Sequence, residues 1–240
     1  MSPAEGKMSP AEGKMSPAEG KMSIVSFLAT FTQRHPIHAV AFALGVGGIG
    51  SYGIATGARL VVPYLAIVIG LGLAIAAFDR RLRFSSVVLS GLVAWGVAHL
   101  AGGLVEFDDG RILYNVVLAR WFHVDNLVHF VGFGAAGLAG VEALRGSLRP
   151  HVASPVVATL VVLFAMGFGA LNEVIEFAAT HLLDAENVGG YENTGRDLVA
   201  NLLGGVVAAA YAMRAERRRP AAGDVLGTLS TGADPGHHRP

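Results

Sequence analysis

The chain has 240 residues, of which 52% are hydrophobic and only 15% are charged. Soluble domains usually carry about a quarter charged residues, so this composition favours a membrane protein over a soluble fold. The absence of cysteine excludes a disulfide framework, a thiolate nucleophile and a zinc–cysteine site, and a formal net charge of zero excludes a strongly basic nucleic-acid-binding protein.

The two ends of the chain differ in composition from the middle. Three copies of MSPAEGK fill residues 1–21, and each contains a proline and lacks the paired apolar positions of a coiled coil. We therefore expect residues 1–22 to be a disordered leader, with Met22 as an alternative start. The tail, residues 220–240, is rich in Pro, Gly, Ala and Asp and is also expected to be disordered.

Six apolar segments lie between these ends and predict an all-α membrane domain over residues 37–213. A bilayer core needs roughly 20 helical residues, and each segment is close to that length. The predicted helices are residues 37–56, 60–78, 84–105, 126–144, 152–179 and 197–213.

The distribution of arginine predicts the orientation of this bundle, because Lys and Arg concentrate in cytoplasmic loops. Arginines cluster before the first helix, between the second and third, between the fourth and fifth, and after the sixth. The other connections are richer in acidic residues. We therefore expect a multi-pass protein of the bacterial inner membrane with both termini in the cytoplasm.

Gly45, Gly47 and Gly50 match the GxGxxG spacing of dinucleotide-binding proteins. No strand is predicted before them and no acidic residue follows at the expected distance, so the pattern does not indicate cofactor binding. Inside a membrane helix, glycines more simply allow close helix packing.

Polar and ionisable residues near one end of the third to sixth helices are the main functional signal. Such residues are costly inside a membrane and usually mark a site. Helical spacing places His129 on one face with Asp125, Glu173 on one face with Glu176, and Asp197 on one face with Asn201. The supporting residues expected around them are His99, Asp125, Asn172, Arg196 and Asn201.

Two glutamates one turn apart repel in a low dielectric unless a shared proton, Arg196, a protonated histidine or a bound cation compensates them. His129, Glu173 and Glu176 are an acceptable ligand set for a divalent metal. With Asp197, the same residues could instead act as general acid and base.

Other interpretations stay open at this stage. Asp125 and Asp197 begin predicted helices, where helix capping alone would explain them. Tyr114, Trp121 and Phe122 are typical of an interfacial aromatic belt, and Trp95 of ordinary packing.

The order of these motifs resembles a known family. It comprises His99, then Asp125-Asn-Leu-Val-His129-Phe, then Asn172-Glu173-Val-Ile-Glu176-Phe, then Glu192-Asn-Thr-Gly-Arg-Asp197. This sequence is similar to the YjdF-type bacterial inner-membrane proteins and to the wider VanZ-like group. The chain departs from the YjdF pattern at Glu192-Asn193-Thr194, where that family usually has Asp-Thr-Gln, and at Phe177, where it often has Trp.

The resemblance implies a helical membrane protein without an established activity, and VanZ-like members are associated with lowered glycopeptide susceptibility. Three functions remain in view: a metal- or proton-dependent enzyme acting on a lipid or envelope precursor, a non-catalytic envelope or antibiotic-resistance factor, and a proton or cation transporter. Transport is disfavoured because the polar residues occupy one half of the membrane and no inverted repeat is evident.

Overall fold

The computed structural model describes residues 24–145, 154–182 and 190–217. The leader expected at residues 1–22 and the tail expected at 220–240 lie outside these residues. The described elements are α1 (Ile24–Arg34), α2 (Pro36–Thr56), α3 (Val61–Leu82), α4 (Ser86–Leu104), the 3-10 turn η1 (Leu113–Asn115), β1 (Val117–Ala119), β2 (Phe122–His123), α5 (Val124–Leu144), α6 (Ser154–Leu182) and α7 (Tyr191–Arg217).

The predicted all-α membrane architecture is confirmed. Six helices, α2 to α7, are long and apolar enough to cross a bilayer. The boundary of the last helix was wrong, because α7 begins at Tyr191 rather than at residue 197. The polar residues 191–196 hid this first turn and a half from a hydropathy argument.

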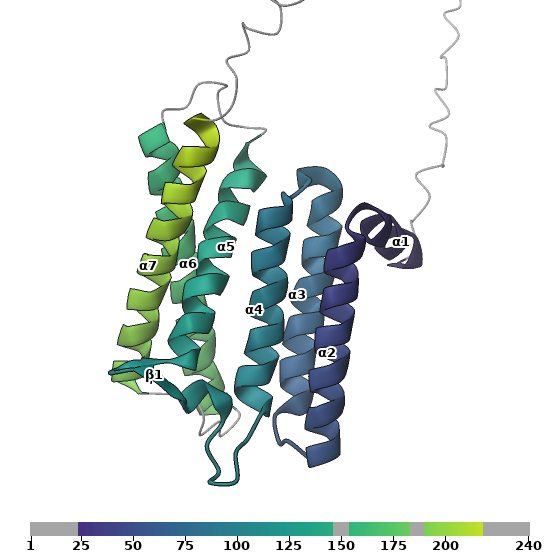
Figure 1. Cartoon of the computed structure of the whole chain (residues 1–240), viewed down its shortest axis with the longest axis vertical. Coiled ribbons are helices and arrows are strands. Elements are labelled where there is room, and N and C mark those ends of the chain that lie inside the picture. Colours follow the sequence, from purple (N-terminus) through teal and green to yellow (C-terminus); the bar gives the residue numbers. More distant parts are fainter. Residues whose placement is uncertain (1–23, 146–153, 183–189, 218–240) are drawn as a thin grey trace, which may run out of the picture.

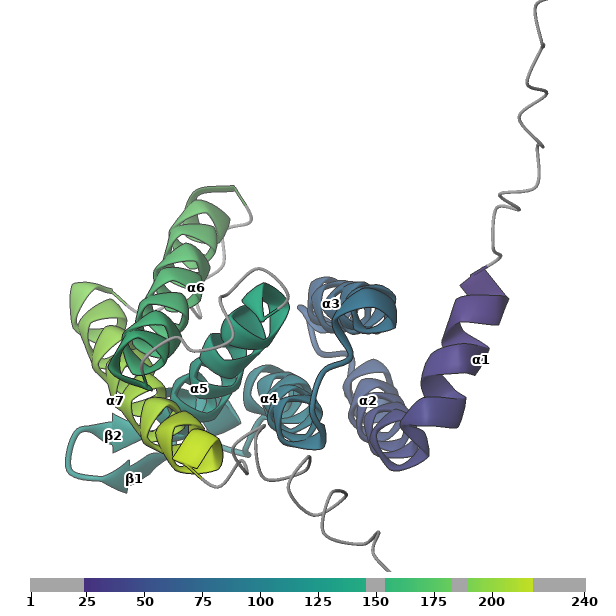
Figure 2. The same cartoon turned by 90° about the horizontal axis from the view of Figure 1, so that it is seen from above.

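The helices form two groups joined by α4. Helices α5, α6 and α7 pack against one another, and α4 packs on α5 and on α2 (Figures 1 and 2). Close approach depends on small residues: a Cβ on Gly134 of α5 would lie 3.0 Å from the carbonyl oxygen of Gly204 in α7. Gly45 and Gly50 of α2 lie against Val97 of α4 and Leu65 of α3, which agrees with a packing role, whereas a Cβ on Gly47 would meet no atom within 4 Å.

The two ends of the bundle differ in their charged residues. At the arginine-rich end lie the connection between α3 and α4 and the end of α7, and the opposite hairpin end carries β1 and β2 (Figure 1). The β1–β2 hairpin leads directly into α5. The described arginines of the first end are Arg34, Arg80, Arg81, Arg83, Arg145, Arg214 and Arg217.

Helix α1 was not predicted. It is a short amphipathic helix that lies across the ends of α2 and α3 (Figures 1 and 2). Arg34 at its end forms an ion pair of 2.9 Å with Asp79 of α3, and His35 Nε2 lies 3.2 Å from the same carboxylate. Asp79 is buried and also accepts a hydrogen bond from the backbone N–H of Phe84, so it holds α1, α3 and the following turn together.

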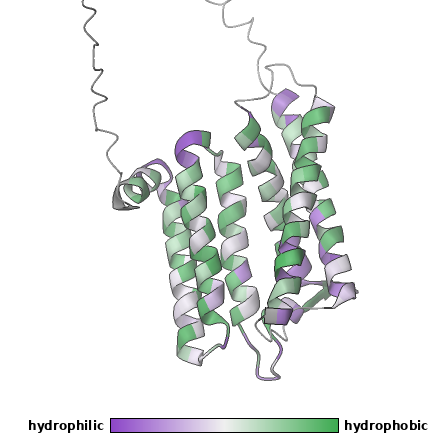
Figure 3. Cartoon of the chain, turned by 180° about the vertical axis from the view of Figure 1, so that it is seen from behind, coloured by the Kyte–Doolittle hydropathy of each residue, from purple (hydrophilic) through white to green (hydrophobic). Residues whose placement is uncertain are grey.

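The outward surface of the bundle is apolar, as a lipid environment requires. Hydrophilic residues gather near the helix ends and within the hairpin-end half of the bundle, whereas most of the remaining length of the helices is hydrophobic or neutral (Figure 3). Leu163, Val174 and Phe177 of α6 and Val207 of α7 are all more than 50% exposed. The buried polar side chains of α5 to α7 therefore stand out against an apolar exterior.

Candidate functional site

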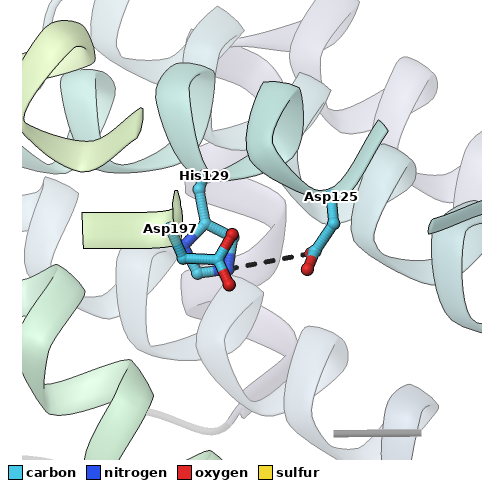
Figure 4. Close-up of side chains that lie close together, drawn as sticks. All are labelled: Asp125, His129 and Asp197. Carbon is cyan, nitrogen blue, oxygen red and sulfur yellow. Dashed lines mark ion pairs between the residues drawn. The ribbon is translucent and has the colours of Figure 1, made fainter. Parts of the chain in front are cut away.

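A polar cluster forms where the first two turns of α5 and of α7 meet the second half of α6. Its ionisable members are His129 and Asp125 of α5, Glu173 and Glu176 of α6, and Asp197 of α7. Each residue was expected in the site from its helical spacing, and the structure brings all five together. Figure 4 shows three of them, with the His129 imidazole beside Asp197 and facing Asp125.

His129 is the centre of the cluster. Its Nε2 lies 3.8 Å from an oxygen of Asp125 and 3.9 Å from an oxygen of Glu176. Its Nδ1 lies 3.2 Å from the amide oxygen of Asn201 and 3.7 Å from an oxygen of Glu173. When Nδ1–H donates to Asn201, the Nε2 lone pair points toward Asp125 and Glu176.

Asp197 is held by amides from two helices. Its two carboxylate oxygens accept hydrogen bonds from Asn126 at 2.8 Å and from Asn193 at 2.6 Å. Asn193 also lies 3.3 Å from Asp125, so it connects the two aspartates. Asp197 and Asn126 are both completely buried, and this network fixes the rotation of α5 relative to α7.

The capping interpretation of the two aspartates was wrong. His123 is the N-cap of α5, and its backbone N–H donates to the Asn126 side chain. Asp125 lies within the first turn of α5, and Asp197 lies more than one turn inside α7. Both carboxylates therefore belong to the polar cluster and do not cap a helix.

The two glutamates have different environments. Glu176 accepts a 2.6 Å hydrogen bond from Asn172 and is partly exposed. Glu173 is 8% exposed, and its Oε1 atom has no hydrogen-bond partner among the described residues. A buried acceptor without a partner requires an explanation, such as an ion or a proton on a neighbouring oxygen.

No arginine in the part of the chain that the structure describes forms an ion pair with this cluster. The suggested compensation by Arg196 was wrong, since its guanidinium binds Glu192 at 2.7 Å on the exposed side of α7. Four carboxylates therefore surround one imidazole in a largely buried setting. Ionised together they would repel strongly, so protons or a cation must balance them.

Two overlapping sets of side chains could hold a metal ion. His129 with Glu173 and Glu176, and His129 with Asp125 and Asp197, each place one ligand atom per residue within 4.8 Å of the others. Zinc–ligand bonds are about 2.0–2.2 Å, so two ligands of one ion can be up to about 4.2 Å apart. One pair from each set falls inside this limit, with His129 Nε2 lying 3.8 Å from Asp125 and 3.9 Å from Glu176.

His99 lies beside the cluster in an aromatic group rather than in either metal set. Its ring centroid is 5.2 Å from that of Trp95 and 5.0 Å from that of Tyr64. The hydroxyl of Tyr114 lies 2.5 Å from His99 Nδ1 and 3.1 Å from its backbone oxygen. Burial raises the pKa of Tyr114 well above its usual value, so this hydroxyl remains a hydrogen-bond donor.

The interfacial belt was thus predicted wrongly for Tyr114, which is buried, whereas Trp121 is exposed. Sequence reasoning also missed Asn126, Asn193 and Tyr64. Asn193 carried a usable signal, because it lies four residues before Asp197 on the same helical face. Asn126 and Tyr64 could not have been identified from the sequence, because their partners depend on how separate helices are rotated.

Together, the fold and the cluster define a polytopic helical membrane protein with a buried acidic and histidine-containing site. Residues 37–218 match the family described as "Predicted membrane protein (DUF2238)", and the chain belongs to this family. No curated protein and no solved structure matches the chain.

Proposed function

We propose that the chain is a divalent-cation-dependent enzyme that acts on a lipid or envelope precursor. The observation that carries the proposal is the gathering of four carboxylates around His129 without an arginine partner among the described residues. A divalent ion would offset two of the four negative charges and give Glu173 Oε1 the partner that it lacks.

The roles follow from the contacts. His129, Glu173 and Glu176 are the proposed metal ligands, and Asp125 is a further ligand on the Nε2 side. Asn201 orients the imidazole, as hydrogen-bonded partners of metal-binding histidines commonly do. Asp197, held by two amides, positions the first turns of α5 and α7 and is the proposed proton acceptor for a bound water.

The location of the site supports the bacterial envelope as the place of action. With the arginine-rich end in the cytoplasm, both termini would be cytoplasmic and the cluster would lie just below the periplasmic surface of the inner membrane. A lipid or lipid-linked precursor in the outer leaflet could reach it from the bilayer.

A second candidate is a non-catalytic envelope factor, as the resemblance to the VanZ-like group suggests. The Asn126–Asp197–Asn193–Asp125 network favours it, because such a network can serve only to fix helix rotation. Proton or cation transport has less support, because α5 to α7 carry only small and apolar buried side chains beyond the cluster.

A comparison of lipids tests the enzyme proposal. Cells that lack the gene would be complemented with the parent chain, with Glu173→Gln, or with Glu192→Gln as a control that alters an exposed glutamate beside the site. We expect one envelope lipid to accumulate in the deletion and with Glu173→Gln, and to return to normal with the parent and the control. Identical lipid profiles in all four strains would reject the enzyme proposal and favour the structural candidate.

A further inference from the structure

A cavity of about 490 Å³ lies beside the polar cluster, between α3, α4 and α6 and the first turns of α5 and α7. It shares Asp125 and Glu176 with the cluster, so its polar wall is continuous with the proposed metal site. Three features of this cavity, its rings, its charge and its opening, define the ligand that fits it.

One wall is aromatic. Tyr64, Trp95, His99 and Tyr114 all line the cavity. The ring of His99 packs against those of Tyr64 and Trp95, with centroid distances of 5.0 and 5.2 Å. Aromatic faces attract organic cations, and several rings together are the usual means of binding a quaternary ammonium group.

The charge of the cavity wall also favours a cationic ligand. Its ionisable acids are Asp125 and Glu176, and no lysine or arginine is among the described residues that line it. The four carboxylates of the cluster, when ionised, exceed the charge of one divalent ion, so the wall stays negative with a metal in place. A phosphate head would have no basic partner here, whereas an ammonium head would have two carboxylates.

Apart from Asn172 and Asn193, the remaining lining residues are apolar and lead toward lipid. Ile67 of α3 and Ile175 of α6 line the cavity and are 47% and 55% exposed on the surface of the bundle. Gly70, one turn from Ile67, also lines it, and a Cβ on this glycine would meet no atom within 4 Å. An alkyl chain can therefore lie along α3 with its head group at the carboxylates.

We infer that this cavity binds an amphiphile with a cationic, amine-type head and an aliphatic chain, taken up sideways from the bilayer. The head lies against the aromatic wall between Asp125 and Glu176, and the chain follows Ile67 and Gly70. The inference concerns recognition at the cavity and does not depend on metal chemistry, although such an amphiphile would also be the substrate class of the proposed enzyme.

Tryptophan fluorescence provides the test, because the chain has only two tryptophans and Trp95 lines the cavity. The full chain with Trp121→Phe, in an uncharged detergent, is titrated with dodecyltrimethylammonium and with dodecyl phosphate. Each titration is run with a chelator and again with zinc. We expect saturable binding of the ammonium probe in both conditions, at least about tenfold tighter than binding of the phosphate probe.

Two variants localise the binding. Asp125→Asn is expected to weaken the ammonium probe at least about tenfold, whereas Asp108→Asn, which removes an exposed acid from the same end, should not. Gly70→Leu keeps every charge and fills the chain path, so it should weaken dodecyltrimethylammonium but not tetramethylammonium. If Asp125→Asn fails to fold, Gly70→Leu still tests the cavity site.

Two results would overturn the inference: equal binding of the two probes, or binding of the phosphate probe that requires zinc. The metal content of the same preparations separates the two proposals. Ammonium binding without stoichiometric metal would support the cavity site and reject the proposed metal enzyme. Stoichiometric metal without ammonium binding would support the metal enzyme and reject the cavity site.

Discussion

His129 shows how far single residues could be predicted. Its helical spacing from Asp125 and its cost inside a membrane marked both residues as functional, and the structure places them 3.8 Å apart. The amides that satisfy the cluster could not be predicted in the same way. Asn126 binds a residue 71 positions away, and no periodicity in one segment specifies the rotation of another.

Asn201 is predicted to position the imidazole of His129. Replacing it with Leu removes the oxygen 3.2 Å from Nδ1 and should lower metal affinity by about 10–100-fold. Asn201→Asp keeps an oxygen at that position and discards the amide nitrogen that has no partner, so it should retain metal. Competitive titration with a zinc indicator measures both. Equal losses in the two variants would contradict a positioning role for the oxygen.

Tyr114 gives a prediction with a pH dependence. Tyr114→Phe removes the hydrogen bond to His99 and should lower the free energy of unfolding by about 1 kcal/mol at neutral pH. Because the pKa of Tyr114 is raised in the folded protein, this contribution is complete below the unfolded pKa of about 10 and falls as the pH rises above it.

The difference in the free energy of unfolding between the parent and Tyr114→Phe should therefore become smaller above about pH 10. Thermal unfolding in detergent on both sides of that pH measures it, with Tyr52→Phe as an exposed control. A difference that is constant across this range would show that the hydroxyl is not buried as described.

At the scale of elements, the six apolar runs were enough to predict the membrane helices, because length and hydropathy alone define a span. Helix α1 was missed because it has 11 residues and an amphipathic pattern, which is too short for a span. The start of α7 was missed because its first turns contain polar residues such as Glu192 and Asn193, and Asn193 binds Asp197 inside the protein.

The contact between α5 and α7 should depend on Gly204. A Cβ there would collide with the backbone of Phe130, so Gly204→Ala should reduce stability by about 1–3 kcal/mol. Gly48→Ala in α2 meets no atom within 4 Å and should be neutral or slightly stabilising, since Ala favours helix. Chemical unfolding in detergent compares the two variants. Equal effects would contradict the packing of α5 on α7.

At the scale of the whole molecule, the sequence predicted one functional end but not its cavity. Tyr64 and Ile175 line the same space although they lie in helices far apart in the chain. Their approach depends on how the two helix groups pack on either side of α4, which no single segment of the sequence specifies (Figure 2).

The proposed orientation can be tested because the chain has no cysteine. Asp108→Cys lies in the connection between α4 and α5, and Arg83→Cys lies between α3 and α4 at the opposite end. A membrane-impermeant maleimide should label the first in intact spheroplasts and the second only after lysis. The reversed pattern would place the polar cluster at the cytoplasmic side.

Elemental analysis of the purified protein shows whether a divalent ion belongs among the carboxylates around His129. We predict about one equivalent of one divalent metal in the parent and in Glu192→Gln, with most of it lost in His129→Ala and Glu173→Gln while helix content is unchanged. A folded parent chain without metal after supplementation, or variants that retain the metal in full, would show that these carboxylates do not hold a divalent ion.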